Sequence, residues 1–167
     1  MDKLKAQGWL DLFANTQRGC SVPDLAEFYA NCNVTNGVVT SVVNEKKLRF
    51  NDKELGEILG APAVGFGVCV REDKTMLGAE RLLKLTQRLS QQPALKTPWS
   101  VRLLFWFIIK NIIPRGQGRN LADAMDQCLT DLLDRWEQIN LPTIMISHIS
   151  RIANMAREHD LGYGFLL

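Results

Sequence analysis

Apolar and polar residues alternate at helical spacing in the N-terminal part of the chain. Large apolar side chains recur on one face from Leu4 to Thr16, which predicts one helix there, and Arg18-Gly19 predicts a turn after it. A second helix is expected from Pro23, because proline is tolerated at the first helical position. Its apolar face consists of Leu25, Phe28 and Tyr29.

A change to β-branched residues marks residues 38–50. The run from Val38 to Val43 and the run from Lys47 to Phe50 flank Asn44-Glu45-Lys46. This arrangement predicts two short strands around a tight turn. An isolated hairpin is only marginally stable in water, so the hairpin is expected to lie against helices.

The segment after the hairpin carries the start and stop signals of a short helix. Asn51 followed by Glu54 is typical of a capping box, and Gly60 with Pro62 beyond it predicts that the helix ends after Leu59. The following residues, 63–72, fit either a glycine-rich loop or a short strand, and the pattern does not decide between them.

Helical spacing returns in the rest of the chain. Further helices are predicted at roughly 75–91, 98–113, 121–138 and 142–158. The apolar stripe of the helix at 121–138 extends to Trp136. The apolar runs LLFWFII at 103–109 and TIMISHI at 143–149 are expected at the centre of the core, because a helix that is apolar on all sides has to be covered. The predicted fold is mainly α, with six to seven helices around one core and a small β-hairpin near residues 38–50.

Length and composition are those of one globular domain. The chain has 167 residues, of which 46% are hydrophobic and 23% charged, so residues 1–167 are predicted to form a single domain. The net charge is only +2, so an interaction with nucleic acid would depend on a local patch. The N-terminal residues lack the pattern of a signal peptide, and the most apolar stretch is too short to span a bilayer. We therefore expect an intracellular protein, in the cytoplasm or nucleus, that does not enter a membrane.

Candidate catalytic and metal-binding residues are few. His148 lies in an apolar helix, where a buried, hydrogen-bonded histidine is the better interpretation, and His159 lies at a helix end, where a cation is favourable. One predicted helix carries several acidic residues together with Arg135, and we interpret them as a solvated face in preference to a cation site: Asp123, Asp126, Asp131 and Asp134. The cysteines show no Cys-x-x-Cys spacing and are expected to be free, mostly buried thiols: Cys20, Cys32, Cys69 and Cys128. We predict no catalytic site, no metal site and no cofactor.

Basic side chains gather in two places. The candidate nucleic-acid-binding residues are Arg81, Lys84 and Arg88, on one face of a predicted helix, and Lys46, Lys47 and Arg49, in the predicted hairpin. Such residues could contact nucleic-acid phosphates, although charged faces are usually only solvated. The aromatic residues that would stack on single-stranded bases are lacking in these segments.

Three blocks of the sequence resemble one known family. The stretch EFYANCNVTNGVVTSVVNEKKLRFNDKELGEILGAP, from Glu27 to Pro62, is similar to a pattern of EFYAN, a hairpin of V-R-G-K-x-V-x-F type and a short helix ending in LLGLP. The block RLLFWFIIKNIIPR, the later segment INLPTIMISHI and the tail LGYGFLL resemble other parts of the same pattern in the same order. The chain thereby resembles the plant transposon protein domain, which is related to open reading frames of Athila-type retrotransposons. Asn44-Glu45-Lys46 departs from the usual Arg-Gly, which leaves the turn type open.

The resemblance implies a plant origin and descent from a mobile element, and it carries no catalytic residues. Two functions follow as hypotheses. The first is a non-enzymatic protein-interaction or assembly module, with a protein partner or self-association, because Trp9, Phe13 and the apolar tail at 165–167 are expected to exceed what one core can cover. The alternative is a nucleic-acid-binding domain that uses the basic helix face and the hairpin.

Overall fold

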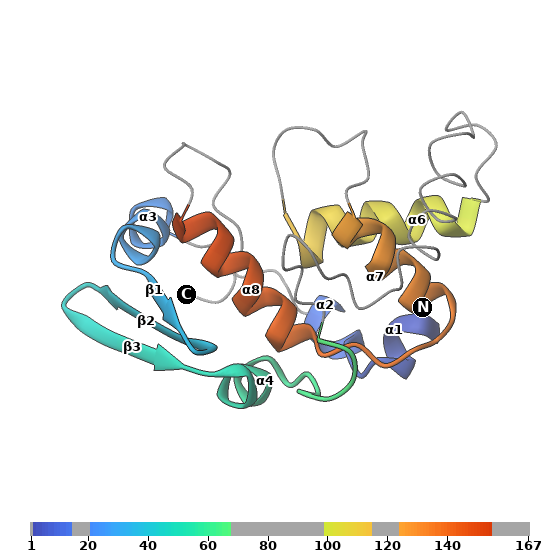
Figure 1. The fold of residues 1–167 in the computed structure, drawn as a ribbon, viewed down its shortest axis with the longest axis horizontal. Helices are drawn as coiled ribbons and strands as arrows, with labels where there is room; N and C mark the ends of the chain where they lie inside the picture. The colour runs from blue at the N-terminus through green and yellow to red at the C-terminus, as the bar shows by residue number, and fades with distance from the viewer. Residues whose placement is uncertain (1, 15–20, 68–98, 115–123, 155–167) are drawn as a thin grey trace.

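A computed structural model describes residues 2–14, 21–67, 99–114 and 124–154 (Figure 1). The helices are α1 (Asp2–Ala6), α2 (Leu10–Ala14), α3 (Val22–Ala30), α4 (Asp52–Leu59), α6 (Trp99–Phe107), α7 (Ala124–Asp134) and α8 (Leu141–Asn154), with a π-helical turn η1 (Ile108–Ile112) directly after α6. The strands β1 (Asn33–Thr35), β2 (Val38–Val43) and β3 (Lys46–Phe50) form one antiparallel sheet. The helix predicted at 75–91 and the tail beyond residue 154 lie outside the described residues.

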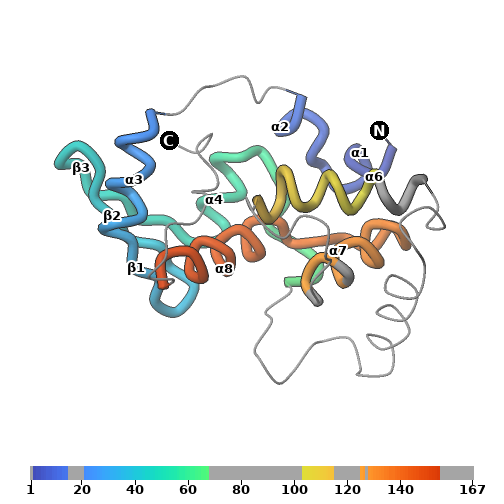
Figure 2. The backbone as a smooth tube through the Cα atoms, turned by 90° about the horizontal axis from the view of Figure 1, so that it is seen from above, coloured from blue at the N-terminus to red at the C-terminus, as the bar shows by residue number. Residues whose placement is uncertain are grey.

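The long helix α8 is the central element. It crosses the middle of the molecule between the sheet and α3 on one side and α6 and α7 on the other, in both views (Figures 1 and 2). It contacts α3, α4, η1 and the strands β1 and β2. Ile144, Met145 and Ile149 are almost completely buried, as the apolar run 143–149 predicts. One hydrophobic cluster joins these residues to buried side chains of α3, α4, η1, α7 and the sheet.

The sheet has three strands, so the prediction of a two-stranded hairpin was incomplete. The strands β1 and β2 are joined by Asn36-Gly37, and β2 and β3 by Asn44-Glu45. All four turn residues have positive φ, which is the signature of type I′ turns. Asn-Gly between two β-branched runs is a strong hairpin signal, and it indicates β1 directly. The described residues therefore combine helices with an antiparallel sheet that is larger than predicted.

The predicted capping box is confirmed at the start of α4. The Asn51 side chain accepts a hydrogen bond from the Glu54 backbone N–H at 3.0 Å, and the Glu54 carboxylate accepts one from the Asn51 backbone N–H at 2.8 Å. Gly60 ends the helix in the left-handed conformation, as predicted. These two signals determine where α4 begins and ends, directly after β3.

The single N-terminal helix predicted from Leu4 to Thr16 was wrong. Gly8 has a φ of 73° and separates α1 from α2. The break allows the buried Gln7 side chain to donate a hydrogen bond to the Glu137 carbonyl at 2.6 Å and to accept one from the Ile139 N–H at 2.9 Å. Tertiary hydrogen bonds to the segment after α7 thus replace a continuous helix.

Three burial predictions for α6 and α7 also need correction. In the apolar run 103–109, Leu103 and Trp106 are exposed and only the last two residues are fully buried, so α6 lies at the edge of the core. Trp136 lies beyond the end of α7 in a left-handed conformation and is exposed, with the Lys3 ammonium 4.7 Å from its ring centroid. Asp126 is completely buried, so the interpretation of a solvated acidic face was wrong for this residue, whereas Asp134 is exposed. The helix α7 packs against α6, and packing between elements, not charge alone, decides which side of a helix is covered.

Candidate functional site

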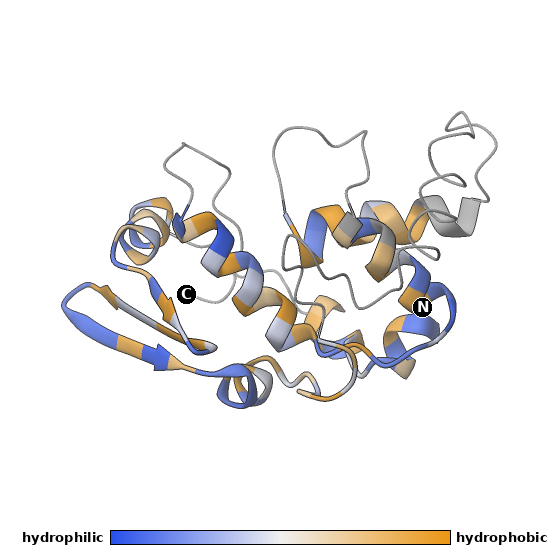
Figure 3. Ribbon diagram, in the orientation of Figure 1, coloured by the Kyte–Doolittle hydropathy of each residue, from blue (hydrophilic) through white to orange (hydrophobic). Residues whose placement is uncertain are grey.

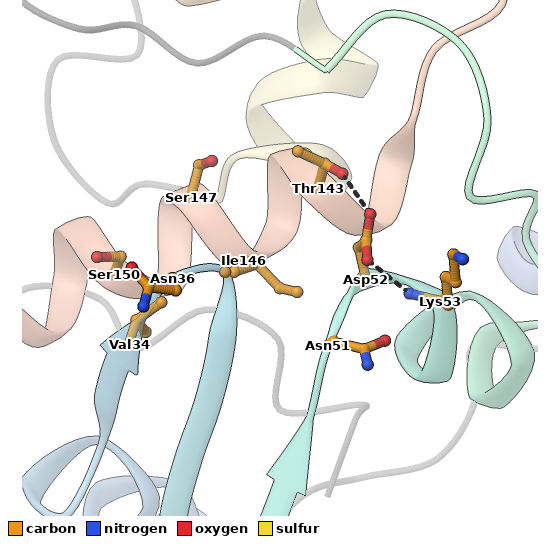
Figure 4. Close-up of a pocket in the computed structure, with 10 residues that line it drawn as sticks. Val34, Asn36, Asn51, Asp52, Lys53, Thr143, Ile146, Ser147 and Ser150 are labelled. Carbon is orange, nitrogen blue, oxygen red and sulfur yellow. Dashed lines mark hydrogen bonds between the residues drawn. The ribbon is translucent and has the colours of Figure 1, made fainter.

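An open groove of about 710 Å³ lies where the β1–β2 turn, the start of α4 and one face of α8 meet (Figure 4). Asn36 and Ser150 lie at one end of the groove, Asp52 and Thr143 lie at the other, and the side chain of Ile146 is between them (Figure 4). The remaining lining residues are Val34, Gly37, Asn51, Lys53 and Ser147. The groove is thus lined mainly by short polar side chains, with Ile146 between its two ends and Val34 beside Asn36 (Figure 4).

Hydrogen bonds hold the α4 end of the groove in place. The Asp52 carboxylate accepts a hydrogen bond from the Thr143 hydroxyl at 3.3 Å and one from the Lys53 backbone N–H at 3.0 Å. Thr143 in turn donates its backbone N–H to the Asn140 side chain at 3.1 Å, which caps the start of α8. The starts of α4 and α8 are therefore linked through one carboxylate, and the groove runs from that link towards the turn at Asn36.

Hydroxyl, amide and aliphatic groups make up most of the described lining. Among the described lining residues there is neither histidine nor cysteine, and Asp52 is the only acidic one. Nucleophilic catalysis by a serine or threonine hydroxyl requires an adjacent base, usually oriented by a third group. Hydroxyl, amide and aliphatic groups are instead well suited to hydrogen-bonding and packing against an extended chain.

Of the basic residues predicted to contact nucleic acid, the structure describes only the three in β3. Arg81, Lys84 and Arg88 lie outside the described residues. In β3, Lys47 and Arg49 share the solvent-facing side of the sheet, opposite Val42 and Thr40, whereas Lys46 belongs to the other side, next to the turn. All three are exposed, and none of them forms an ion pair with a described residue. The hairpin therefore presents two adjacent cations, and not a cluster of three.

His148 is buried, as its position in α8 predicts. The second histidine, His159, lies outside the described residues. Within the ranges that the structure describes, no group of three or more His, Cys, Asp or Glu side chains is arranged to hold a metal ion. His148 is thus placed as a core residue on the helix that also lines the groove.

Replacing His148 with alanine is expected to lower the free energy of unfolding by about 1–3 kcal/mol, because the change removes a buried polar side chain together with its hydrogen-bonding capacity. Urea denaturation followed by circular dichroism measures this loss. Partner binding by the folded fraction is expected to remain unchanged. An unchanged melting temperature combined with loss of binding would contradict the structural role of His148.

Burial also determines the state of the thiols. Cys32 is partly buried and Cys128 is buried, and both are thiols outside a disulfide, while Cys20 and Cys69 lie outside the described residues. Burial raises the pKa of the Cys32 thiol from its ordinary value of 9.0 to about 11. Burial, together with the nearby Cys32, raises the pKa of Tyr29 above its usual range. At neutral pH both groups are neutral, and Cys32 is a poor nucleophile.

These shifts predict a loss of stability at alkaline pH. The unfolded chain releases the Cys32 proton near its ordinary pKa of 9.0, whereas the folded chain holds it to about 11, so stability is fully present below pH 9 and falls as the pH rises towards 11. A Cys32→Ser variant is expected to lose less stability over the same interval. Urea denaturation at pH 7, 9 and 10.5 measures the difference, and parallel curves for the two proteins would contradict the prediction.

The N-terminal aromatic residues do not form an exposed apolar surface. Trp9 is completely buried, and Phe13 is partly buried, with its ring 4.9 Å from that of Phe107 in an edge-to-face arrangement. The apolar tail at 165–167 lies outside the described residues. Among the described residues, the exposed large apolar ones are Val22, Ile58, Val64, Phe66, Leu103, Trp106 and Trp136. The expectation of excess N-terminal aromatic surface was therefore wrong.

The sequence interpretation missed the groove. Its lining comes from β1 and the turn after it, the start of α4 and one face of α8, and no spacing in the sequence relates these segments. Asn36-Gly37 marks the turn, and the capping box marks the start of α4, but neither signal indicates that α8 lies beside both. Thr143, Ser147 and Ser150 recur at helical spacing on α8, which is the one pattern that points to a shared polar face.

Comparisons with protein-family models, with curated proteins and with solved structures found no match. A search of the helices in the described ranges found none with the length and apolar character needed to cross a bilayer.

Proposed function

We propose that this chain is a non-enzymatic protein-interaction or assembly module that binds an extended segment of a protein partner in the groove beside α8. The observation that carries the proposal is the described lining of that groove, in which hydroxyl and amide groups accompany Val34 and Ile146 and no described lining residue is a histidine or a cysteine. As formed by the described residues, the groove is not enclosed, whereas small-molecule sites usually enclose most of their ligand. The proposed descent from a plant retrotransposon is supported by the sequence motifs alone.

A variant in which a larger side chain fills the groove tests the proposed binding of a partner segment. Selection of a random peptide library against the wild-type chain yields defined ligands, whose affinities are measured by fluorescence polarisation. A Ser150→Tyr variant places a ring at the end of the groove near Asn36 and is expected to weaken the selected peptides by about tenfold or more, since loss of about 1.4 kcal/mol of contacts has this effect.

Asn154→Tyr is the matched control. Asn154 lies one turn further along α8, is exposed and does not line the groove, and its side chain bonds to Ser150. This variant removes the same side-chain contact between Asn154 and Ser150 without filling the groove, so binding is expected to persist. Selected peptides that bind the Ser150→Tyr variant as tightly as the wild type would contradict the proposal. Light scattering over a range of concentrations shows whether a second copy of the chain is the partner.

Nucleic-acid binding is the second candidate, and the pair Lys47 and Arg49 favours it. Both are exposed on one face of the sheet without an ion-pair partner among the described residues. Aromatic side chains for base stacking are lacking on this face of β2 and β3, so affinity would depend on phosphate contacts. This function predicts binding to single- or double-stranded oligonucleotides that weakens steeply with added salt. Absence of binding by the wild type at low salt excludes it.

A further inference from the structure

The strand β3 forms an edge of the sheet. It pairs with β2 on one side, and none of the described strands pairs with its other side. Figure 3 shows hydrophilic and hydrophobic residues alternating along it. Leu48 and Phe50 are half-buried and pack against the core, while Lys47 and Arg49 are exposed. At the outer edge of β3, the backbone is therefore held in place by its pairing with β2, and two cationic side chains face solvent.

The register determines which backbone groups face outwards. Val43 and Lys46 flank the two-residue turn, so they form a hydrogen-bonded pair, and the pairs alternate from there. Ser41 with Leu48 and Val39 with Phe50 are the next hydrogen-bonded pairs. The N–H and C=O groups of Lys47 and Arg49 consequently point away from β2, towards the open edge.

Lys47 and Arg49 can therefore bind an added strand in two ways, through their backbone hydrogen-bonding groups and through their charged side chains. Their backbone groups are directed at a strand that would lie beside β3, and their side chains stand on one face of that extended sheet. The positions opposite them on an added antiparallel strand are two residues apart and share this face. Carboxylates at these positions would complement the two cations, since opposite charges on directly facing residues stabilise a strand pair. The residue between the carboxylates would face the side occupied by Leu48.

We propose that β3 accepts an extended acidic segment of a protein partner as a fourth strand, with the pattern acidic–apolar–acidic opposite Lys47, Leu48 and Arg49. Backbone hydrogen bonds to an exposed sheet edge provide affinity in this mode of recognition, and the alternating side chains provide specificity. The edge is separate from the groove beside α8, so this interaction is additional to the proposed function of that groove.

Charge also excludes the simplest alternative occupant. Two copies of β3 paired antiparallel would place Lys47 and Arg49 opposite each other, and like charges on facing residues destabilise a strand pair. Basic residues on an edge strand therefore prevent self-pairing, as edge lysines commonly do. The same residues leave the edge open to a strand of opposite charge.

A charge exchange tests the proposal. The probe is a short blocked peptide with a central Glu-Val-Glu between threonines, compared with the same peptide carrying Lys-Val-Lys. Binding is measured by nuclear magnetic resonance titration of the full chain, with hydrogen exchange of the Lys47 and Arg49 amides as the structural readout. The wild type is expected to prefer Glu-Val-Glu by about tenfold or more, with protection of both amides. A Lys47→Glu/Arg49→Glu variant is expected to reverse the preference.

Two matched controls separate strand pairing from charge alone. A Lys46→Glu variant changes the charge of the same strand on the opposite face, so its preference for Glu-Val-Glu is expected to remain. Methylation of the two glutamate backbone nitrogens removes the donors to β3 without changing charge, and binding is expected to be lost. The inference is overturned if the methylated peptide binds equally well, if neither peptide binds, or if a single-stranded oligonucleotide protects the same amides at lower concentration than Glu-Val-Glu. The groove variant Ser150→Tyr is expected to bind Glu-Val-Glu normally, so failure of one site does not imply failure of the other.

Discussion

Replacing Trp9 with alanine is expected to lower the free energy of unfolding by about 3–5 kcal/mol, the usual cost of removing a large buried aromatic side chain. Trp9 is completely buried at the break between α1 and α2. Its ring lies 6.4 Å from that of Phe13, which in turn contacts Phe107 of α6. Loss of the indole leaves a cavity under both short helices, and neither helix is long enough to be stable without its packing.

Trp9→Phe is the informative comparison. The indole Nε1 is buried and has no hydrogen-bond partner among the described residues. Phenylalanine reduces the buried side-chain volume but also removes this unpaired donor. The Trp9→Phe variant is therefore expected to lower the free energy of unfolding by only about 1 kcal/mol. Urea denaturation followed by circular dichroism measures both variants. A phenylalanine variant as unstable as the alanine variant would show that the indole N–H is stabilised by its surroundings.

Replacing Gly65 with alanine is expected to destabilise the fold by about 3 kcal/mol or more. Gly65 has a φ of 102°, and an added Cβ would lie 2.5 Å from the carbonyl carbon of Gln138 and closer still to its oxygen. The adjacent residue, Phe66, donates its N–H to the Gln138 carbonyl at 2.8 Å and accepts from the Asn140 N–H at 3.0 Å. The chain would have to move away from Gln138, and both hydrogen bonds would be lost.

Gly60→Ala is the matched control for backbone strain. Gly60 also has a positive φ, of 63°, but an added Cβ would meet no atom within 4 Å. Only the conformational penalty remains there, about 1 kcal/mol. The difference between the two variants in thermal denaturation therefore measures the close approach of residue 65 to Gln138. Equal melting temperatures for the two variants would contradict that role for Gly65.

Local signals in the sequence predicted several elements correctly. The capping box at Asn51 and the terminal glycine at position 60 defined α4, because both act through hydrogen bonds and backbone conformations within a few residues. The β2–β3 hairpin and the apolar face of α8 followed from alternation and helical spacing. The strand β1 was equally local, since Asn36-Gly37 indicates it, and only the interpretation of that signal was incomplete.

Contacts between distant segments decided the rest. Periodicity predicted a continuous helix through Gly8, but Gln7 forms its hydrogen bonds with Glu137 and Ile139, and no local pattern reveals a partner so far along the chain. The burial of Asp126 and the exposure of Trp136 depend on which faces other helices cover and on where α7 ends.

The candidate sites also combine features that follow from the local sequence with features that depend on contacts between distant segments. Alternation along the strand is enough to place Lys47 and Arg49 on one face, because side chains alternate with a period of two. The packing of whole elements makes β3 an open edge in the described part of the chain, and it brings α8 beside the β1–β2 turn and α4 to form the groove. Periodicity assigns each residue to a face of its own element, whereas the arrangement of whole elements depends on the summed packing of all their faces.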